Sequence, residues 1–390
     1  MREGWEVKTL GEIGKVSMCK RILKKQTSNE GDIPFYKIGT FGKNPNAFIS
    51  KEIYEEFRAK YSFPKKGDIL LSASGTIGRR VIYDGKPAYF QDSNIVWIDN
   101  DEEKVLNEYL YEFYGFCNWN PSKGATISRL YNDDLRKIEI PIPPLPEQKQ
   151  IVKTLNLAFG QIDQAKANLE QNLANAKALF ASKLNEVFSQ RGEGWEEKTL
   201  KEVCEKITDG THQTPKYFDD GIIFLSSRNV TSGKINWDNI KYIDEKQHIA
   251  MHKRVAPRIG DILLAKNGTT GVAAIVDRDV VFDIYVSLAH IRVLDEVLPH
   301  YMLHFINSPL AKKQFNSRLK GTGVPNLHLK EIRDVIIPFP KSLEEQEQII
   351  KVLNDFSKIT KEAETHYQQN LNNLEELKKS ILEKAFKGEL

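Results

Sequence analysis

The sequence predicts an α+β fold, arranged as a globular unit, a long helix, a second globular unit and a second long helix. Residues 147–188 and 345–386 align with each other without a gap at an offset of 198. Both stretches carry apolar residues at alternating steps of three and four, which indicates helices with a narrow apolar seam. The segment before each stretch also repeats. The chain is therefore a duplicated unit, that is, an internal repeat.

Residues 1–143 form the first globular unit. Its strand-like runs are short, rich in β-branched and aromatic residues, and separated by Gly, Asn and Asp turns. These runs are Ile33–Ile38, Asp68–Ser72, Arg80–Tyr83 and Asn94–Ile98. An aromatic helix is expected over Val105–Cys117. The proline-rich run Pro141–Pro146 ends the unit, because proline continues neither a helix nor a central strand.

Residues 144–190 and 342–390 are predicted to be the long helices. About 42 residues of helix reach roughly 63 Å, which is long for a globular protein and favours a coiled coil over two core helices of one large domain. Pro146 suits a first turn, and Ser342 with Glu345 would form a capping box. The residues expected on the helix-pairing seam are Ile151, Leu155, Ile162, Leu169, Asn172, Leu179, Ile349, Leu353, Phe356, Tyr367, Asn370, Leu377 and Ile381. The two asparagines would fix the register at a cost in stability.

Residues 191–341 form the second globular unit, which restarts the pattern of the first. Gly194–Val203 repeats Gly4–Ile13, and "GDILLAKNGTTG" repeats "GDILLSASGTIG". We interpret Gly-Asp as a turn and the apolar run as a buried strand. The glycine pairs that follow are read as tight turns, although Gly and Thr can also approach a phosphate. Between these anchors the units differ widely, as expected if one scaffold carries two different surfaces.

The composition is that of an ordinary protein outside the membrane. Of the 390 residues, 40% are hydrophobic and 28% are charged, with a net charge of +3. No apolar run is long enough to span a membrane, and the N-terminus does not resemble a signal peptide. Cys19, Cys117 and Cys204 form no CxxC pair, so we expect free thiols and a cytoplasmic location.

No catalytic constellation is present in the sequence. It lacks a GxxxxGK[ST] phosphate loop, HExxH and GxSxG. Asp133 and Asp134 are interpreted as N-terminal caps of a helix. The histidines are judged to have no metal-ligand spacing, and His212 is taken as a surface loop residue. The expectation is therefore no catalytic residue, no metal site and no cofactor in this chain.

Basic and amide side chains in loops are the candidates for nucleic-acid contact. Arg reads guanine, Asn and Gln read adenine, and Lys mostly contacts phosphate. Each one alone is more often a solvated surface group. The candidates are Lys20, Arg21, Lys24, Lys25, Thr76, Arg79, Arg80, Lys123, Arg129, Thr211, His212, Gln213, Arg228, Asn229, Lys266, Asn267, Thr269, Arg318, Lys320 and Asn326.

The whole chain resembles the specificity subunits of type I restriction–modification systems. The resemblance is carried by the duplicated plan, by "GDILL…G" in each unit and by "PPLPEQKQI" and "EEQEQI" at the heads of the helices. The closing "AFKGEL" and the run Ile207–Leu225 add to it. One departure is that Ser128 and Arg129 stand where the second repeat has Pro325 and Asn326, which argues against a shared base contact there.

The resemblance implies that each globular unit is a target-recognition domain of mixed α/β structure. It also implies that the two helices pair antiparallel as a spacer, and that the target is a bipartite site on double-stranded DNA. The subunit would not be an enzyme. Two modification (methyltransferase) subunits would methylate adenine with S-adenosylmethionine, and restriction (translocase/endonuclease) subunits would cleave DNA using ATP.

Two other functions are compatible with the residues themselves. A stand-alone DNA-binding regulator would need no methyltransferase partner. A coiled-coil scaffold would use the globular units for ligands other than DNA. Co-purification with a companion of methyltransferase size distinguishes the specificity subunit from both.

Overall fold

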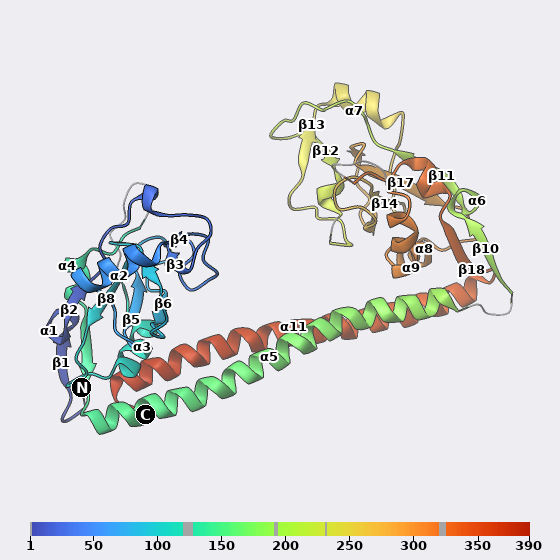
Figure 1. The fold of residues 1–390 in the computed structure, drawn as a ribbon. Helices are drawn as coiled ribbons and strands as arrows, with labels where there is room; N and C mark the ends of the chain where they lie inside the picture. The colour runs from blue at the N-terminus through green and yellow to red at the C-terminus, as the bar shows by residue number, and fades with distance from the viewer. Residues whose placement is uncertain (1, 120–127, 191–193, 231, 320–324) are drawn as a thin grey trace. The chain divides into compact units, whose positions relative to one another are not determined.

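The computed structural model describes residues 2–119, 128–190, 194–230, 232–319 and 325–390. The chain divides into two compact units. The first comprises residues 1–169 and 369–390, and the second comprises residues 170–368. Each unit therefore contains one globular part and half of each long helix (Figure 1). The α+β class and the repeat are confirmed.

Within the residues that the structure describes, the first unit contains three small sheets. Its strands are β1 (Glu6–Thr9), β2 (Lys15–Ser17), β3 (Ile33–Tyr36), β4 (Phe48–Ile49), β5 (Ile69–Ser72), β6 (Arg80–Ile82), β7 (Tyr89–Phe90), β8 (Ile95–Asp99) and β9 (Glu139–Ile142). The sheet orders are β2-β8-β5-β6, β4-β3-β7 and β1-β9, and β3 and β7 run parallel. The helical segments are α1 (Leu10–Ile13), η1 (Lys24–Gln26), α2 (Lys51–Lys60), α3 (Asn107–Phe116) and α4 (Asn132–Arg136).

The second unit repeats this topology strand for strand. Its strands are β10 (Trp195–Thr199), β11 (Cys204–Asp209), β12 (Ile222–Leu225), β13 (Lys241–Ile243), β14 (Ile262–Ala265), β15 (Ala273–Ile275), β16 (Phe282–Ile284), β17 (Leu288–Val293) and β18 (Ile336–Pro340). The orders are β11-β17-β14-β15, β13-β12-β16 and β10-β18, with β12 and β16 parallel. The helical segments are α6 (Leu200–Val203), η2 (Ser227–Asn229), α7 (Glu245–His252), α8 (Pro299–Ile306), α9 (Pro309–Asn316) and α10 (Leu329–Arg333).

The Gly-Asp-Ile-Leu-Leu repeats form a turn followed by a buried strand in both units, as predicted. Every residue of β5 and β14 is buried. The preceding Gly67 and Gly260 have φ of 96° and 88°, a conformation that side chains other than glycine rarely adopt. The next residue accepts a backbone N–H from three residues earlier, at 2.7 Å for Asp68 and 2.9 Å for Asp261. The shared motif is thus explained by backbone geometry.

A buried glutamine fixes the start of each long helix to its own globular part. Gln148 in α5 (Leu145–Ser189) accepts the backbone N–H of Leu106 and donates to the carbonyls of Lys104 and Pro143, at 2.7–2.8 Å. Gln346 in α11 (Leu343–Lys387) makes the equivalent three bonds in the second unit. Both side chains are fully buried. Each glutamine pairs one backbone N–H and two backbone carbonyls. Leaving a buried backbone group without a hydrogen-bond partner costs about 1–3 kcal/mol, which accounts for the repeated glutamine at the start of each long helix.

A phenylalanine near the end of each long helix completes the core of the opposite repeat. Phe386 of α11 packs on Tyr109 and Phe113 of α3, with ring centroids 5.2 and 5.5 Å apart. Phe188 of α5 packs in the same way on Tyr301 of α8, at 5.4 Å. Phe188 is fully buried and Phe386 is 5% exposed. Each globular part is therefore closed by a helix end that belongs to the other repeat in sequence.

The two long helices are antiparallel, as the resemblance implied. In the first unit Lys166 pairs with Glu375 at 2.6 Å, and Asp163 pairs with Lys378 at 3.3 Å. Residue numbers therefore rise along α5 as they fall along α11. The helices are 45 residues each. Exposed ion pairs of this kind each contribute only about 0.2–1 kcal/mol, so the apolar seam supplies most of the pairing energy.

The predicted seam is correct in the first part of each long helix and wrong at four positions further along. Ile151, Leu155, Ile162 and Leu353 are buried, and Leu169, Ile349, Phe356, Tyr367 and Ile381 are half-buried. Asn172, Leu179, Asn370 and Leu377 are exposed instead. A helix of 3.6 residues per turn drifts against a 3.5-residue repeat, so the seam takes an extra step of four after Leu169. It continues through Leu173, Ala176 and Phe180, and the asparagines fix no register.

Two predicted helix caps also differ from the structure. Ser342 accepts the N–H of Glu345 at 3.3 Å, but the Glu345 carboxylate accepts from the indole N–H of Trp195 at 2.8 Å instead of closing a capping box. Helix α4 has Tyr131 at its N-cap position, so Asp133 and Asp134 lie in its first turn. Acidic residues there still favour the helix through its dipole.

The cysteines are free thiols, as expected, and burial raises the pKa of each of Cys19, Cys117 and Cys204 to about 12. Only the thiolate is nucleophilic, and a thiol whose pKa is raised so far is almost entirely un-ionised at pH 8. We therefore expect iodoacetamide to modify essentially no cysteine in the folded chain at pH 8 and all three in urea. Mass spectrometry of intact protein measures this. Rapid labelling of the folded protein would contradict the buried positions.

Among the described residues, no helix is long and apolar enough to cross a membrane.

Candidate nucleic-acid interface

The second unit has a cavity of about 390 Å³ where its parallel strands β12 and β16 end. Its walls come from the loop before β12, from η2 and the loop after it, and from the residues that follow β16. The lining residues are Tyr217, Phe224, Ser226, Ser227, Arg228, Asn229, Asn236, Asn239, Lys241, Tyr285 and Ser287. Hydroxyl, amide and basic groups predominate, as in surfaces that contact phosphates and base edges.

The first unit has a smaller cavity, of about 260 Å³, at the equivalent place. It is lined by Arg21, Ile22, Lys24, Thr27, Phe35, Lys37, Gln91, Asp92, Ser93 and Asn94. Phe35 is the third residue of β3, and Phe224 is the third residue of β12. Each phenylalanine lines its cavity from beside a parallel neighbour, β7 or β16. The two cavities therefore occupy the same position on one scaffold.

The two cavities differ in chemistry. In the first unit Arg21 forms an ion pair with Asp92 at 2.7 Å. In the second unit Tyr217 and Tyr285 both lie near Phe224, with ring centroids 6.1 and 6.2 Å from its ring. Burial raises the pKa of Tyr217, so its hydroxyl is neutral and can both donate and accept. The second cavity is thus aromatic and amide-rich, while the first is dominated by charge.

The run Asp209-Gly210-Thr211 supports one wall of the second cavity. Asp209 is buried and binds Lys266 at 3.0 Å, together with Arg254. Burial alone would raise the pKa of Asp209, but the hydrogen bonds from Arg254 and Lys266 hold it below its usual range. Gly210 leaves no room for a Cβ against the backbone of β16. Thr211 then forms a parallel bridge with the cavity residue Tyr285.

Some predicted contact residues lie at these cavities or beside them. Arg21, Lys24, Arg228 and Asn229 line them. Arg129 reaches the rim of the first cavity, where its guanidinium donates to the carbonyl of Ser93 at 3.4 Å. Asn229 is buried, accepts the N–H of Ser226 and donates to the carbonyls of Asn236 and Asn239, so it shapes the cavity loop.

Other predicted residues are committed to contacts elsewhere. Arg80 lies over the ring of Tyr111 at 4.3 Å and beside the buried Glu112. Lys266 is buried against Asp209. The guanidinium groups of Arg79 and Arg318 donate to the carbonyls of Phe41 and Gln314. Exposed positions away from the cavity linings are Lys20, Lys25, Thr76, His212, Gln213 and Thr269, and Lys123 and Lys320 lie outside the described residues.

The departure between the repeats at Arg129 and Asn326 does not extend to the backbone. Arg129 forms an isolated antiparallel bridge with Ser74, and Asn326 forms the same bridge with Asn267. The side chains differ while the strand-like pairing is kept. A common backbone with exchanged side chains is again what two recognition surfaces on one scaffold require.

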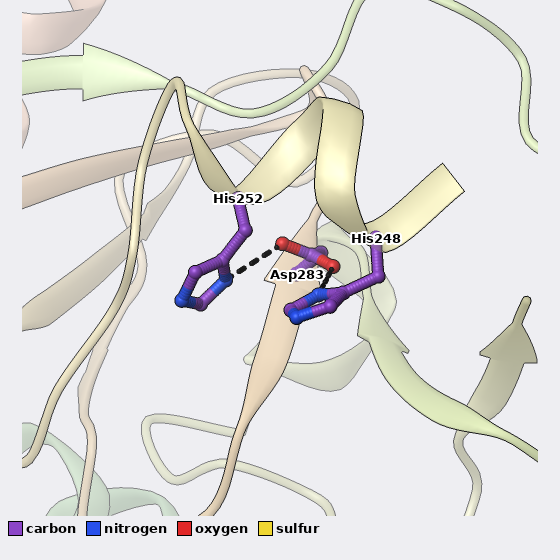
Figure 2. A group of neighbouring side chains, drawn as sticks. All are labelled: His248, His252 and Asp283. Atoms are coloured by element: carbon purple, nitrogen blue, oxygen red, sulfur yellow. Dashed lines mark hydrogen bonds and ion pairs between the residues drawn. The ribbon is translucent and has the colours of Figure 1, made fainter. Parts of the chain in front are cut away.

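Sequence reasoning missed Lys37, Tyr217, Asn236, Asn239, Lys241 and Tyr285 in the cavity walls. It also missed a group of histidines. His248 and His252 are one helical turn apart on α7, and both contact the buried Asp283 of β16 (Figure 2). The spacing of four residues was visible in "HIAMH", contrary to our expectation that the histidines have no metal-ligand spacing.

Comparison with known proteins gives consistent matches. The family model described as "Type I restriction modification DNA specificity domain" matches residues 2–174 and 192–373. The EcoBI specificity subunit of Escherichia coli is 23% identical over all of this chain and 87% of its own. A Haemophilus influenzae protein, provisionally named as the specificity subunit S.HindORF215P, is 66% identical over 147 residues, which is 38% of each chain.

Two solved structures share the fold. A chain from a study of complex assembly and conformational transition in a type I R-M system has a TM-score of 0.78, with 19% identity over 100% of this chain and 99% of that one. The HsdS subunit from Thermoanaerobacter tengcongensis has a TM-score of 0.59, with 19% identity over 100% and 98%.

Proposed function

Because the chain belongs to the family of type I restriction–modification DNA specificity proteins, we propose that it selects a bipartite DNA target and directs adenine methylation and restriction by partner subunits. Each globular part reads one half-site. The long helices connect the two globular parts that read the half-sites. Methylation of a base within a duplex requires that base to be flipped into a pocket. In this proposal the methyltransferase partner supplies the pocket, and this chain recruits the partner.

The observation that carries this proposal is the pair of cavities at one place on a duplicated scaffold. A protein with two copies of a domain related by pseudo-two-fold symmetry is suited to two half-sites. The same cavity position with different side chains is suited to two different half-site sequences. Arg21 and Arg228 can each donate to guanine or phosphate, and Asn236 and Asn239 can pair with adenine.

The catalytic steps belong to partners in this proposal. Two modification subunits supply S-adenosylmethionine chemistry, and restriction subunits supply ATP-driven translocation and cleavage. In this proposal the chain itself holds neither S-adenosylmethionine nor ATP. The buried glutamine clamps and the phenylalanine ends hold the helices to both globular parts, which gives partner subunits a defined surface to dock on. A stand-alone regulator would need no such partner. The next experiment therefore compares the chain with and without modification subunits.

We expect the purified chain alone to transfer no methyl group to DNA, and the chain mixed with its modification subunits to methylate one bipartite motif. The reason is that the sequence lacks both a phosphate loop and an adenine-methyltransferase motif. The measurement is incorporation of labelled methyl groups from S-adenosylmethionine into DNA, followed by sequencing of methylated adenines. The modification subunits alone are the matched control. Methyl transfer by the isolated chain would contradict the proposal, and specific DNA binding without any effect on a methyltransferase would favour the regulator.

A further inference from the structure

A cluster of two histidines and one aspartate joins α7 to the sheet of the second unit. His248 Nδ1 lies 2.7 Å from one carboxylate oxygen of Asp283, and His252 Nδ1 lies 3.1 Å from the other. The two imidazole rings face the carboxylate from one side of the helix, with the carboxylate between them (Figure 2). One ligand atom from each of the three residues lies within 4.8 Å of the others.

Among the described residues of the first unit, no such group lies at the equivalent place. Helices α2 and α7 both begin with an N-cap side chain, Ser50 or Asp244, that accepts the backbone N–H of the residue three positions later. Counted from these caps, His248 corresponds to Tyr54 and His252 to Arg58. Along the strands, Phe35 pairs with Tyr89, and Phe224 pairs with Asp283.

At that place the first unit uses an aromatic contact. Tyr89 is fully buried and packs against Phe57 of α2, with ring centroids 6.1 Å apart. In the second unit a carboxylate that is 1% exposed replaces the tyrosine. No residue of α7 is buried, so little apolar contact holds this helix to the sheet. The second unit has thus exchanged an apolar contact for a buried carboxylate, and buried charges in proteins are either paired or coordinate a metal.

We propose that His248, His252 and Asp283 bind a Zn²⁺ ion. Two histidines four residues apart on a helix present their rings on one face, and a carboxylate from a neighbouring element completes three protein ligands. Two imidazole nitrogens and one carboxylate oxygen are a donor set for zinc and similar transition metals, not for Mg²⁺ or Ca²⁺. Ligand atoms of a tetrahedral zinc site are about 3.3 Å apart. The two imidazole–carboxylate distances here, 2.7 and 3.1 Å, are near that value. The fourth position is left for water.

The surroundings suit an ion that enters from solvent. The side chain of His252 is 31% exposed and that of His248 is 18% exposed, while the carboxylate of Asp283 is buried. An imidazole nitrogen that donates its hydrogen to the carboxylate must give up that hydrogen to bind metal. Zinc therefore replaces the two hydrogen bonds with two metal–nitrogen bonds and leaves the carboxylate paired.

The ion would stiffen one wall of the second cavity. Gln247, next to His248 on α7, accepts the N–H of Lys216 at 2.9 Å and donates to its carbonyl at 3.0 Å. The neighbouring Tyr217 lines the cavity. Fixing α7 to β16 thus fixes the backbone that carries Tyr217. The first unit, with its aromatic contact, would be unaffected by zinc.

The test is zinc uptake by the untagged full chain after dialysis against a chelator, measured by calorimetric titration with zinc chloride at pH 7.5. We expect one Zn²⁺ per chain. Asp283→Asn and His248→Gln should each weaken binding by about 100-fold or more, since losing an outer-shell partner alone costs about 10- to 100-fold. Replacing Zn²⁺ by Co²⁺ should give the visible absorption of a tetrahedral site.

The matched control is His366→Asn, which removes an exposed histidine on α11 outside the cluster. It should bind zinc as the unaltered chain does. Circular dichroism checks that each variant is folded. Hydrogen exchange of residues 210–221 should slow on zinc addition in the unaltered chain and not in Asp283→Asn. If the unaltered chain takes up no stoichiometric zinc, or if Asp283→Asn takes up the same amount, the proposal is wrong.

Discussion

Replacing residues 1–143 with the equivalent unit of a relative is expected to change one half of the methylated motif completely and leave the other half unchanged. Each unit has its own cavity, and the residues that line one cavity all lie within one compact unit. The measurement is the methylated motif found by sequencing genomic DNA from cells that carry the exchanged chain and its modification subunits.

The structure refines the design of this exchange. The first globular part is closed by Leu382, Ala385 and Phe386 of α11, which pack in its core. An incoming unit must therefore keep aromatic residues at the positions of Tyr109 and Phe113, or bring its own helix end with it. The reverse exchange, of residues 191–341, is the matched control and should change the other half alone. A change in both halves after either exchange would refute independent reading.

Inserting four residues after Asn172 and four after Asn370 is expected to lengthen the gap between half-sites by about one or two base pairs. Four residues add ~6 Å of helix, and DNA rises 3.4 Å per base pair along one strand. Four residues also turn a helix by about 400°, within ~40° of a full turn, so each recognition surface keeps nearly its original orientation.

The two insertion points lie within three residues of the limits of the compact units. The seam inside each unit therefore keeps its pairing. An insertion in α5 alone is the control, because it makes the two helices unequal and forces one seam to slip by four residues, which lowers stability. Sequencing of methylated DNA reports the gap. An unchanged gap after the double insertion would mean that the helices do not set the spacing.

The elements of this fold could be predicted because their signals are local. Strand β5 and its repeat β14 are short apolar runs after Gly-Asp, and the long helices show their period over 45 residues. The seam prediction failed beyond Leu169 because the drift between 3.6 and 3.5 residues per turn accumulates along the helix. The choice between Asn172 and Leu173 depends on the partner helix. Apolar character alone favoured Leu173, and the repeated asparagines obscured it.

The cavities could be predicted only in part because their walls meet through tertiary structure. Lys266 looked like a free loop cation, but Asp209, far away in sequence, neutralises it. Arg80 also looked free, but its guanidinium lies over the ring of Tyr111 and beside the carboxylate of Glu112, both on α3. Tyr285 and Tyr217 reach one cavity from two separate loops. A list of basic residues cannot reveal such pairings, since it contains no information on which carboxylates are buried beside them.

The exchange of phenylalanine ends between the repeats has a consequence for synthesis on the ribosome. Tyr109 is translated well before its partner Phe386, because the whole second globular part lies between them in sequence. The first globular part therefore keeps an apolar surface uncovered until the second globular part and α11 have emerged. Contacts of such high sequence separation slow folding and expose intermediates to aggregation. The second globular part has Phe188 in place before its own strands are made, so it can complete its core first.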